Sequence, residues 1–150
     1  MVQRFAAVLA GLWAGVLLGI GAIAAPSAFA TLASGDAGRF VGRVFVQEAY
    51  LSLGIAVALL LIERQRSQAD AASGIGSVFS ASILLLLGTL FCTVGGYFAV
   101  QPMMDAARAG QGAVSFGMLH AVSGGLFLLK GLLVLALAWR LQAPARAARA

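Results

Sequence analysis

The sequence is short of charge, cysteine and histidine, and each shortage excludes a class of protein. Only 10% of the 150 residues are charged, 61% are hydrophobic and the mean hydropathy is +0.98, values far outside the range of soluble globular domains. The single cysteine, Cys92, cannot form an internal disulfide, and with a single histidine, His120, the chain has no Cys/His cluster for zinc. Composition therefore predicts one membrane-embedded bundle.

Motifs for catalysis are also lacking. The chain has no carboxylate pair, no nucleophile with a base beside it, no Gly-rich phosphate loop after a strand and no zinc motif. Its net charge of +5 comes from arginines concentrated at the ends of apolar runs, which fits contacts with anionic lipid headgroups and not nucleic acid. We therefore expect a protein of the lipid bilayer without catalytic activity and without a cofactor.

Four long apolar runs are what the chain has instead. They cover about residues 5–26, 40–64, 77–101 and 114–140. Each is long enough to cross a hydrocarbon core of about 30 Å at about 1.5 Å per residue. Pro26 and Pro102 are expected to end the first and third helices. The sequence predicts an all-α membrane protein whose four transmembrane helices form two hairpins in one bundle.

The arginines predict its orientation. One side of the bundle should carry only Arg39, Arg43 and Arg108. The other side should carry the majority, namely Arg4, Arg64, Arg66, Arg140, Arg146 and Arg149. Because positive charge gathers on the cytoplasmic side, both termini are expected to be cytoplasmic, in a multi-pass protein of the bacterial inner membrane.

The first run also resembles a secretory signal, because Ala28-Phe29-Ala30 imitates a cleavage site. Its uncharged stretch from Phe5 to Ala25 is longer than the roughly 7–15 apolar residues that such signals use. We expect the helix to be retained; cleavage would leave Thr31 as the mature N-terminus.

Small residues in the first run predict a helix contact. Gly11, Gly15 and Gly19 recur every four residues and place bare backbone along one face, where another helix can approach closely. We interpret them as helix-packing positions, at which self-association or a membrane protein partner can be accommodated.

The two halves of the chain show a weak internal repeat. A shift of 76 positions aligns Pro26 with Pro102, Phe40 with Phe116 and Arg64 with Arg140. This pattern predicts two parallel hairpins related by an axis along the membrane normal.

Ionisable residues inside the apolar runs are the candidates for function. Lys130 lies ten residues before Arg140, hence about 15 Å deep, near the midplane. Glu48 is offset from it by about 9 Å along the bundle axis, and a lysine side chain leans toward the start of its helix, so we predict that the two pair or share a water. Arg43, His120 and Ser123 should lie nearer the outer surface.

Two interpretations of these residues stay open. In the first, which we favour, Glu48 and Lys130 form a fixed ion pair that sets the helix register, while His120 and Ser123 bond a loop or headgroups. In the second, the ionisable side chains mark a path for a proton or a cation, as intramembrane charges commonly do.

A Cu(I) site at the outer ends of the last two helices is a weaker hypothesis. Thioether and imidazole are soft ligands, and the candidates are Met103, Met104, Met118 and His120. Methionine is more often flexible filler, so we predict no metal site. One histidine offers haem one axial ligand only, so haem is not expected either.

Several short motifs occur in order along the chain. They comprise Trp13 and Gly15, Pro26 and Phe29, Gly42, Arg43 and Phe45, then Pro102, and finally Phe116, His120 and Ser123. Together they resemble the DUF4149 or TMEM205-like family of integral membrane proteins. The resemblance implies a four-helix inner-membrane protein of unestablished activity, and the association of the eukaryotic relative with resistance to a platinum drug implies an accessory or stress-related role. The alternative is a transporter or channel subunit for a metal or other cation.

Overall fold

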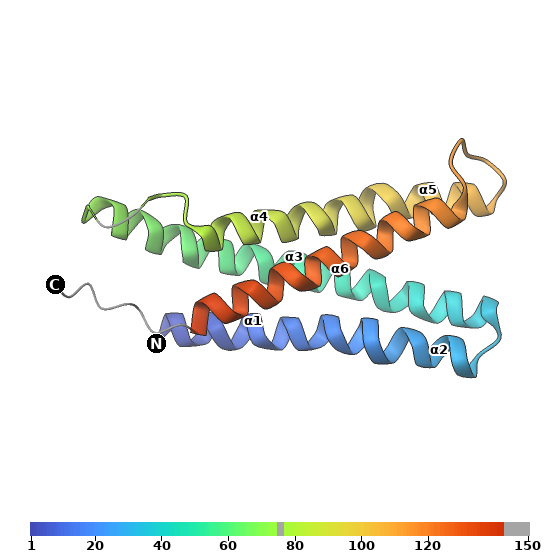
Figure 1. Cartoon of the computed structure of the whole chain (residues 1–150), viewed down its shortest axis with the longest axis horizontal. Helices are drawn as coiled ribbons and strands as arrows, with labels where there is room; N and C mark the ends of the chain where they lie inside the picture. The colour runs from blue at the N-terminus through green and yellow to red at the C-terminus, as the bar shows by residue number, and fades with distance from the viewer. Residues whose placement is uncertain (75–76, 143–150) are drawn as a thin grey trace.

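The computed structural model describes residues 1–74 and 77–142, and every regular element in these ranges is helical (Figure 1). In chain order the elements are α1 (Val2–Gly19), η1 (Ile20–Ala24), α2 (Ala25–Thr31), α3 (Ser34–Ala72), α4 (Ala81–Thr93), η2 (Val94–Val100), α5 (Gln101–Arg108) and α6 (Phe116–Gln142), where η1 and η2 are π-helical. The elements α1, η1 and α2 run on as one rod, as do α4, η2 and α5.

Within residues 1–74 and 77–142, four helices are long and apolar enough to cross a membrane. They are Val2–Thr31, Ser34–Ala72, Ala81–Arg108 and Phe116–Gln142. Large apolar side chains such as Leu12, Phe91 and Trp139 stay exposed, as a lipid-facing surface requires. The prediction of an all-helical fold with four long apolar helices packed together is therefore confirmed. The cytoplasmic position of both termini stays a prediction.

The helices continue through the two prolines that were expected to end them. Pro26 lies in the first turn of α2 and Pro102 in the first turn of α5, so the prediction that helices stop there is wrong. Proline lacks an N–H, and its ring crowds the carbonyl four residues earlier. A π-helical segment directly precedes each of α2 and α5, and its wider turn displaces that carbonyl while the rod continues.

The same two segments bear on the predicted internal repeat. Shifted by 76 positions, Ile20–Ala24 falls within Val94–Val100, and Ala25–Thr31 falls within Gln101–Arg108. A π-helical segment followed by a proline therefore occurs at matching places in both hairpins, which extends the predicted repeat from the aligned prolines to the backbone before them.

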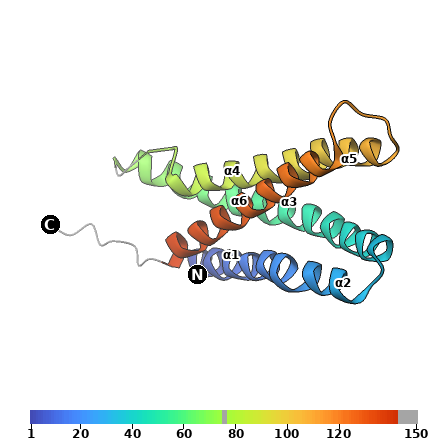
Figure 2. The same ribbon diagram turned by 45° about the vertical axis from the view of Figure 1, so that its right-hand side comes forward.

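The two hairpins cross. The two helices of each hairpin lie side by side at the end that carries their short connection, with α2 beside α3 and α5 beside α6 (Figures 1 and 2). This end is here called the connection end. Toward the opposite end, which holds the N-terminus and is here called the terminal end, each hairpin opens. There α6 packs against α1, and α4 packs against α3. Consequently α3 and α6 lie diagonally across the bundle from one another.

The apolar core is concentrated toward the terminal end. Its fully buried members include Trp13 of α1, Leu59 of α3, Leu86 of α4 and Leu137 of α6. A second, smaller cluster at the connection end joins Val100, Met104 and Leu119, which all belong to the second hairpin. The two hairpins thus share a core in one half of the bundle, and in the other half they separate.

The glycines expected to pack helices together do not do so within the described part of the chain. No atom lies within 4 Å of the place that a Cβ would take on Gly11, Gly15 or Gly19. The buried face of α1 is formed by Ala6, Ala10, Trp13, Ala14 and Leu17, whose side chains offer more contact than bare backbone. Close approach occurs at Gly88, where a Cβ would lie 3.0 Å from Leu133 Cδ1. Packing of the Gly11 face against a second protein stays a prediction.

Candidate functional site

A buried ion pair joins the two diagonal helices. The Lys130 ammonium on α6 donates to both carboxylate oxygens of Glu48 on α3, at 2.7 Å to Oε1 and 2.8 Å to Oε2. The side chains of Lys130 and Glu48 are only 5% and 3% exposed. The prediction that these two residues pair is therefore confirmed, and the contact is direct.

The pair belongs to a longer hydrogen-bonded chain. The Ser52 hydroxyl, one turn along α3, donates to Glu48 Oε1 and accepts a hydrogen bond of 2.8 Å from Trp13 Nε1 on α1. Lys130 Nζ also lies 5.2 Å from the centroid of the Phe127 ring. Three of the four rods thereby contribute to one polar network in the middle of an apolar bundle.

These hydrogen bonds determine whether the free-energy cost of burying the two charges is offset. Removing a carboxylate and an ammonium from water costs several kcal/mol per ion, and attraction offsets that cost only when the geometry is good and the remaining lone pairs are satisfied. Both carboxylate oxygens of Glu48 accept hydrogen bonds here, and every buried side-chain nitrogen and oxygen of the described residues has a partner. The pair is thus a buried, hydrogen-bonded contact between α3 and α6.

A cavity of about 660 Å³ lies between the two hairpins, on the connection side of the pair. Glu48, Lys130 and Thr93 line its deep end, and Arg39, Arg108 and Phe116 line its outer part. The walls between are mostly apolar, with Phe45 and Phe127 among them. The cavity exists because the hairpins separate in this half of the bundle.

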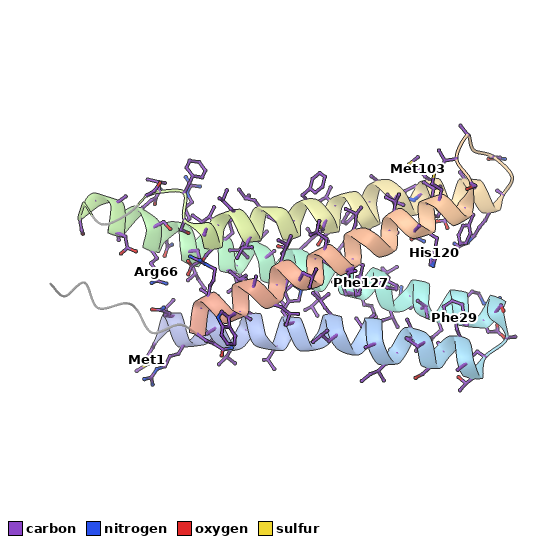
Figure 3. All side chains as sticks on the ribbon, in the orientation of Figure 1. Met1, Phe29, Arg66, Met103, His120 and Phe127 are labelled. Atoms are coloured by element: carbon purple, nitrogen blue, oxygen red, sulfur yellow. The ribbon has the colours of Figure 1, made fainter. Side chains whose placement is uncertain are left out.

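The structure gathers four of the five predicted polar residues around this cavity. Glu48, His120, Ser123 and Lys130 all line it, whereas Arg43 is exposed and lies outside its lining. In Figure 3 the His120 side chain projects from α6 toward the space between the hairpins. Their grouping follows from the diagonal placement of α3 and α6.

His120 is held by aromatic contacts at the outer part of the cavity. Its ring stacks on that of Phe116 with centroids 5.8 Å apart, and the Arg108 guanidinium lies 4.7 Å from the centroid of the same Phe116 ring. Neither His120 nor Ser123 makes a side-chain hydrogen bond to another described residue, so the predicted bonding of these two residues to a loop is not found there. Their polar groups face the cavity instead.

The four candidate Cu(I) ligands are not brought together. Met104 is buried and lines the cavity with His120, but Met103 and Met118 are 47% and 63% exposed and lie outside it. Figure 3 shows Met103 on the side of α5 that faces away from His120. Within residues 1–74 and 77–142, no three His, Cys, Asp or Glu side chains are grouped so that they could hold a metal ion.

The chain matches the family model described as "Domain of unknown function (DUF4149)" over residues 8–113. It belongs to the DUF4149 family. The comparisons with curated proteins and with solved structures found no match. The DUF4149 match covers the whole first hairpin from Val8 onward and the third rod, including Glu48 and Ser52, while Lys130 and His120 follow it in the sequence.

The motif residues that carried the resemblance to DUF4149 gather at two places. Trp13 lies in the core and bonds Ser52, whereas Gly15 is exposed, and Pro26 and Pro102 follow the π-helical segments. Six further motif residues share the cavity lining, namely Phe29, Gly42, Phe45, Phe116, His120 and Ser123, whereas Arg43 is exposed and lies outside it. The sequence pattern therefore describes the cavity of this DUF4149 protein more than its core.

Sequence reasoning missed two members of the polar network. Ser52 stands four residues after Glu48, a spacing that puts two polar side chains on one face of an apolar helix, and this signal could have identified it. No comparable signal pointed to the Trp13 indole as its hydrogen-bond donor, because that contact depends on how α1 is rotated against α3.

Proposed function

We propose that this DUF4149 protein is a non-enzymatic accessory or stress-related protein of the bacterial inner membrane, in which the Glu48–Lys130 pair is a structural brace. The observation that carries the proposal is that the pair is buried, and that both carboxylate oxygens of Glu48 accept hydrogen bonds from Lys130. A group that relays protons or cations must change its hydrogen-bond partners during transport, whereas Glu48 and Lys130 are already hydrogen-bonded to each other.

The position of the pair in the bundle also favours a brace. The cavity extends from the connection end into the bundle as far as Glu48 and Lys130. Toward the terminal end the bundle is filled by core side chains, of which Leu59, Leu86 and Leu137 are 0% exposed. A packed apolar layer of this kind resists the passage of hydrated ions.

The membrane and the orientation are proposed from charge. The described arginines of the expected cytoplasmic set, Arg4, Arg64, Arg66 and Arg140, lie on helix segments of the terminal end. Arg146 and Arg149 belong to the same predicted set and lie outside the described residues. The four candidate spans and this asymmetry support a multi-pass protein with both termini in the cytoplasm.

Reconstitution into liposomes tests the brace against conduction. With a pH-sensitive or Cu(I)-sensitive dye inside, we expect the flux of protons and Cu(I) to match that of empty liposomes. Flux above this background that is abolished by Glu48→Gln would overturn the proposal. Asp70→Asn is the matched control, because it makes the same change at an exposed position of α3.

A subunit of a cation transporter or channel is the second candidate, and one observation favours it. The cavity connects the outer part of the bundle with the Glu48 carboxylate, which is the half of a path that an alternating-access protein needs. The flux assay above separates the two candidates.

The stress-related role is tested in cells. A deletion strain would be challenged with copper, silver and lipophilic cations, and we expect impaired growth that the native gene restores. Growth equal to that of the parent strain under all three challenges would contradict this part of the proposal.

A further inference from the structure

The inner part of the cavity, from the level of His120 to that of Lys130, has about the depth of one membrane leaflet. His120 and Lys130 both line it and are ten residues apart on α6, which corresponds to about 15 Å along the helix axis. A hydrocarbon core of about 30 Å gives each leaflet about 15 Å. A lipid chain whose head lies at the level of His120 would therefore end at the level of Lys130.

The lining combines apolar walls with basic groups. Four phenylalanines contribute to the lining, Phe29, Phe45, Phe116 and Phe127, and such a surface suits hydrocarbon. The basic residues of the lining are Arg39, Arg108, His120 and Lys130, whereas Glu48 is its one acidic residue in the described part of the chain. The lining thus favours an anion at its outer part.

Arg39 and Arg108 each pair with an aspartate but keep guanidinium N–H donors available for a ligand. Asp36 pairs with Arg39, and Asp105 pairs with Arg108 at 2.9 Å, but neither aspartate lines the cavity. A guanidinium has five N–H donors, so one carboxylate contact does not exhaust it. Tyr97 and Gln101 also line the cavity and make no side-chain hydrogen bond to other described residues.

A cationic ligand would fit less well. Glu48 is the acid that it would need, and that carboxylate already accepts hydrogen bonds from Lys130 and Ser52. A cation would have to displace Lys130 and leave its ammonium buried without a counter-charge, which costs several kcal/mol.

We propose that the cavity binds an acyl chain that carries an anionic head. The head lies against Arg39, Arg108 and His120, and the chain runs between Phe45 and Phe127 toward the Glu48–Lys130 pair. The ligand reaches the cavity from the lipid, since Phe29 and Phe116 of the lining are 54% and 36% exposed. A free fatty acid and an acidic phospholipid both have this chemistry.

Photo-crosslinking of the full-length protein in phosphatidylcholine nanodiscs tests the proposal. One arm uses hexadecanoate with a diazirine in its chain, and the other uses phosphatidylglycerol with the same chain, followed by peptide mapping. We expect adducts on peptides that contain Phe45, Thr93 or Phe127. Labelling by the first probe alone identifies a free fatty acid, and labelling by the second identifies an acidic phospholipid; both outcomes support the proposal.

Two variants fill the cavity without disturbing the helices. A Cβ on Gly42 or Gly124 meets no atom within 4 Å, and both glycines line the cavity, so Gly42→Leu and Gly124→Leu place side chains in its free space. We expect each to reduce labelling at least about fivefold, because about 1 kcal/mol of lost chain contact corresponds to that factor. Gly54→Leu is the matched control outside the lining, and its labelling should equal that of the native chain.

The head is tested by the double variant Arg39→Gln with Arg108→Gln. Because two charged donors are lost, the concentration of unlabelled hexadecanoate that halves photo-labelling should rise roughly tenfold or more. Arg43→Gln, which removes a charge outside the lining, should leave it unchanged. The proposal fails if hexadecyltrimethylammonium competes as well as hexadecanoate, if adducts fall only on lipid-facing peptides, or if both leucine variants label like the native chain while eluting as folded protein.

Discussion

Removing Lys130 should destabilise this bundle more than removing any exposed charge. In Lys130→Met the apolar length of the side chain is kept, while the Glu48 carboxylate loses the hydrogen bonds that Lys130 donates to both of its oxygens. A buried charge without a partner costs about 3–5 kcal/mol. We therefore expect the free energy of unfolding to fall by about that amount.

The double variant shows where that cost comes from. Glu48→Gln keeps an oxygen that accepts from Ser52 but removes the negative charge. Combined with Lys130→Met it leaves no charge at the place of the pair, and replacing a whole buried pair is often neutral or stabilising. We expect the free energy of unfolding of the double variant to lie within about 1–2 kcal/mol of that of the native chain. This loss is much smaller than the sum of the losses in the two single variants.

Reversible unfolding in mixed micelles, followed by circular dichroism, measures these free energies. Asp105→Asn is the control, since it breaks an ion pair whose side chains are at least half exposed, and such pairs contribute about 0–1 kcal/mol. The reasoning is refuted if Lys130→Met costs no more than Asp105→Asn, or if the double variant is as unstable as the two single changes added together.

Two further predictions concern packing and hydrogen bonding, and a third concerns the first helix. Gly88→Leu should lower the free energy of unfolding by about 1–3 kcal/mol in the same assay because α6 approaches α4 there, whereas Gly15→Leu should not destabilise the monomer. Reduced self-association of Gly15→Leu, measured by crosslinking, would identify the Gly11 face as an interface. Trp13→Phe should cost about 0.5–1.5 kcal/mol through the lost hydrogen bond to Ser52, and Ser52→Ala should cost less in its background than in the native chain, because only the hydrogen bond to Glu48 is then left to lose. Intact mass should show a chain that retains the first helix and does not begin at Thr31.

The contact between Glu48 and Lys130 could be predicted from the sequence because depth and opposite charge were enough to suggest it. Residues counted from a charged end of an apolar run give a distance from the interface, through the fixed rise of the helix. Two side chains at similar depth in a narrow bundle, one acidic and one basic, have few other partners. The contact of Trp13 with Ser52 was missed because it depends on the rotation of each helix about its axis, which depth does not determine.

The ends of the helices were predicted less well, because a local rule was overridden. Proline kinks or ends a helix when the turn before it is a regular α turn. In this chain the π-helical segments η1 and η2 precede Pro26 and Pro102 and remove the conflict, so the rods extend to Thr31 and Arg108. The recurrence of small residues before both prolines, Gly21 and Ala22 in one rod and Gly95 and Gly96 in the other, is compatible with such wider turns.

The cavity could not be predicted at all, since it results from the crossing of the hairpins. The core side chains that join the hairpins lie toward the terminal end, and the connections hold each hairpin closed at the other end. Two closed hairpins that share a core at one end only must diverge at the other. Glu48 and Lys130 lie where this divergence begins, so one contact both completes the shared core and forms the deep end of the cavity. Weakening that contact should therefore change the depth of the cavity together with the stability of the bundle.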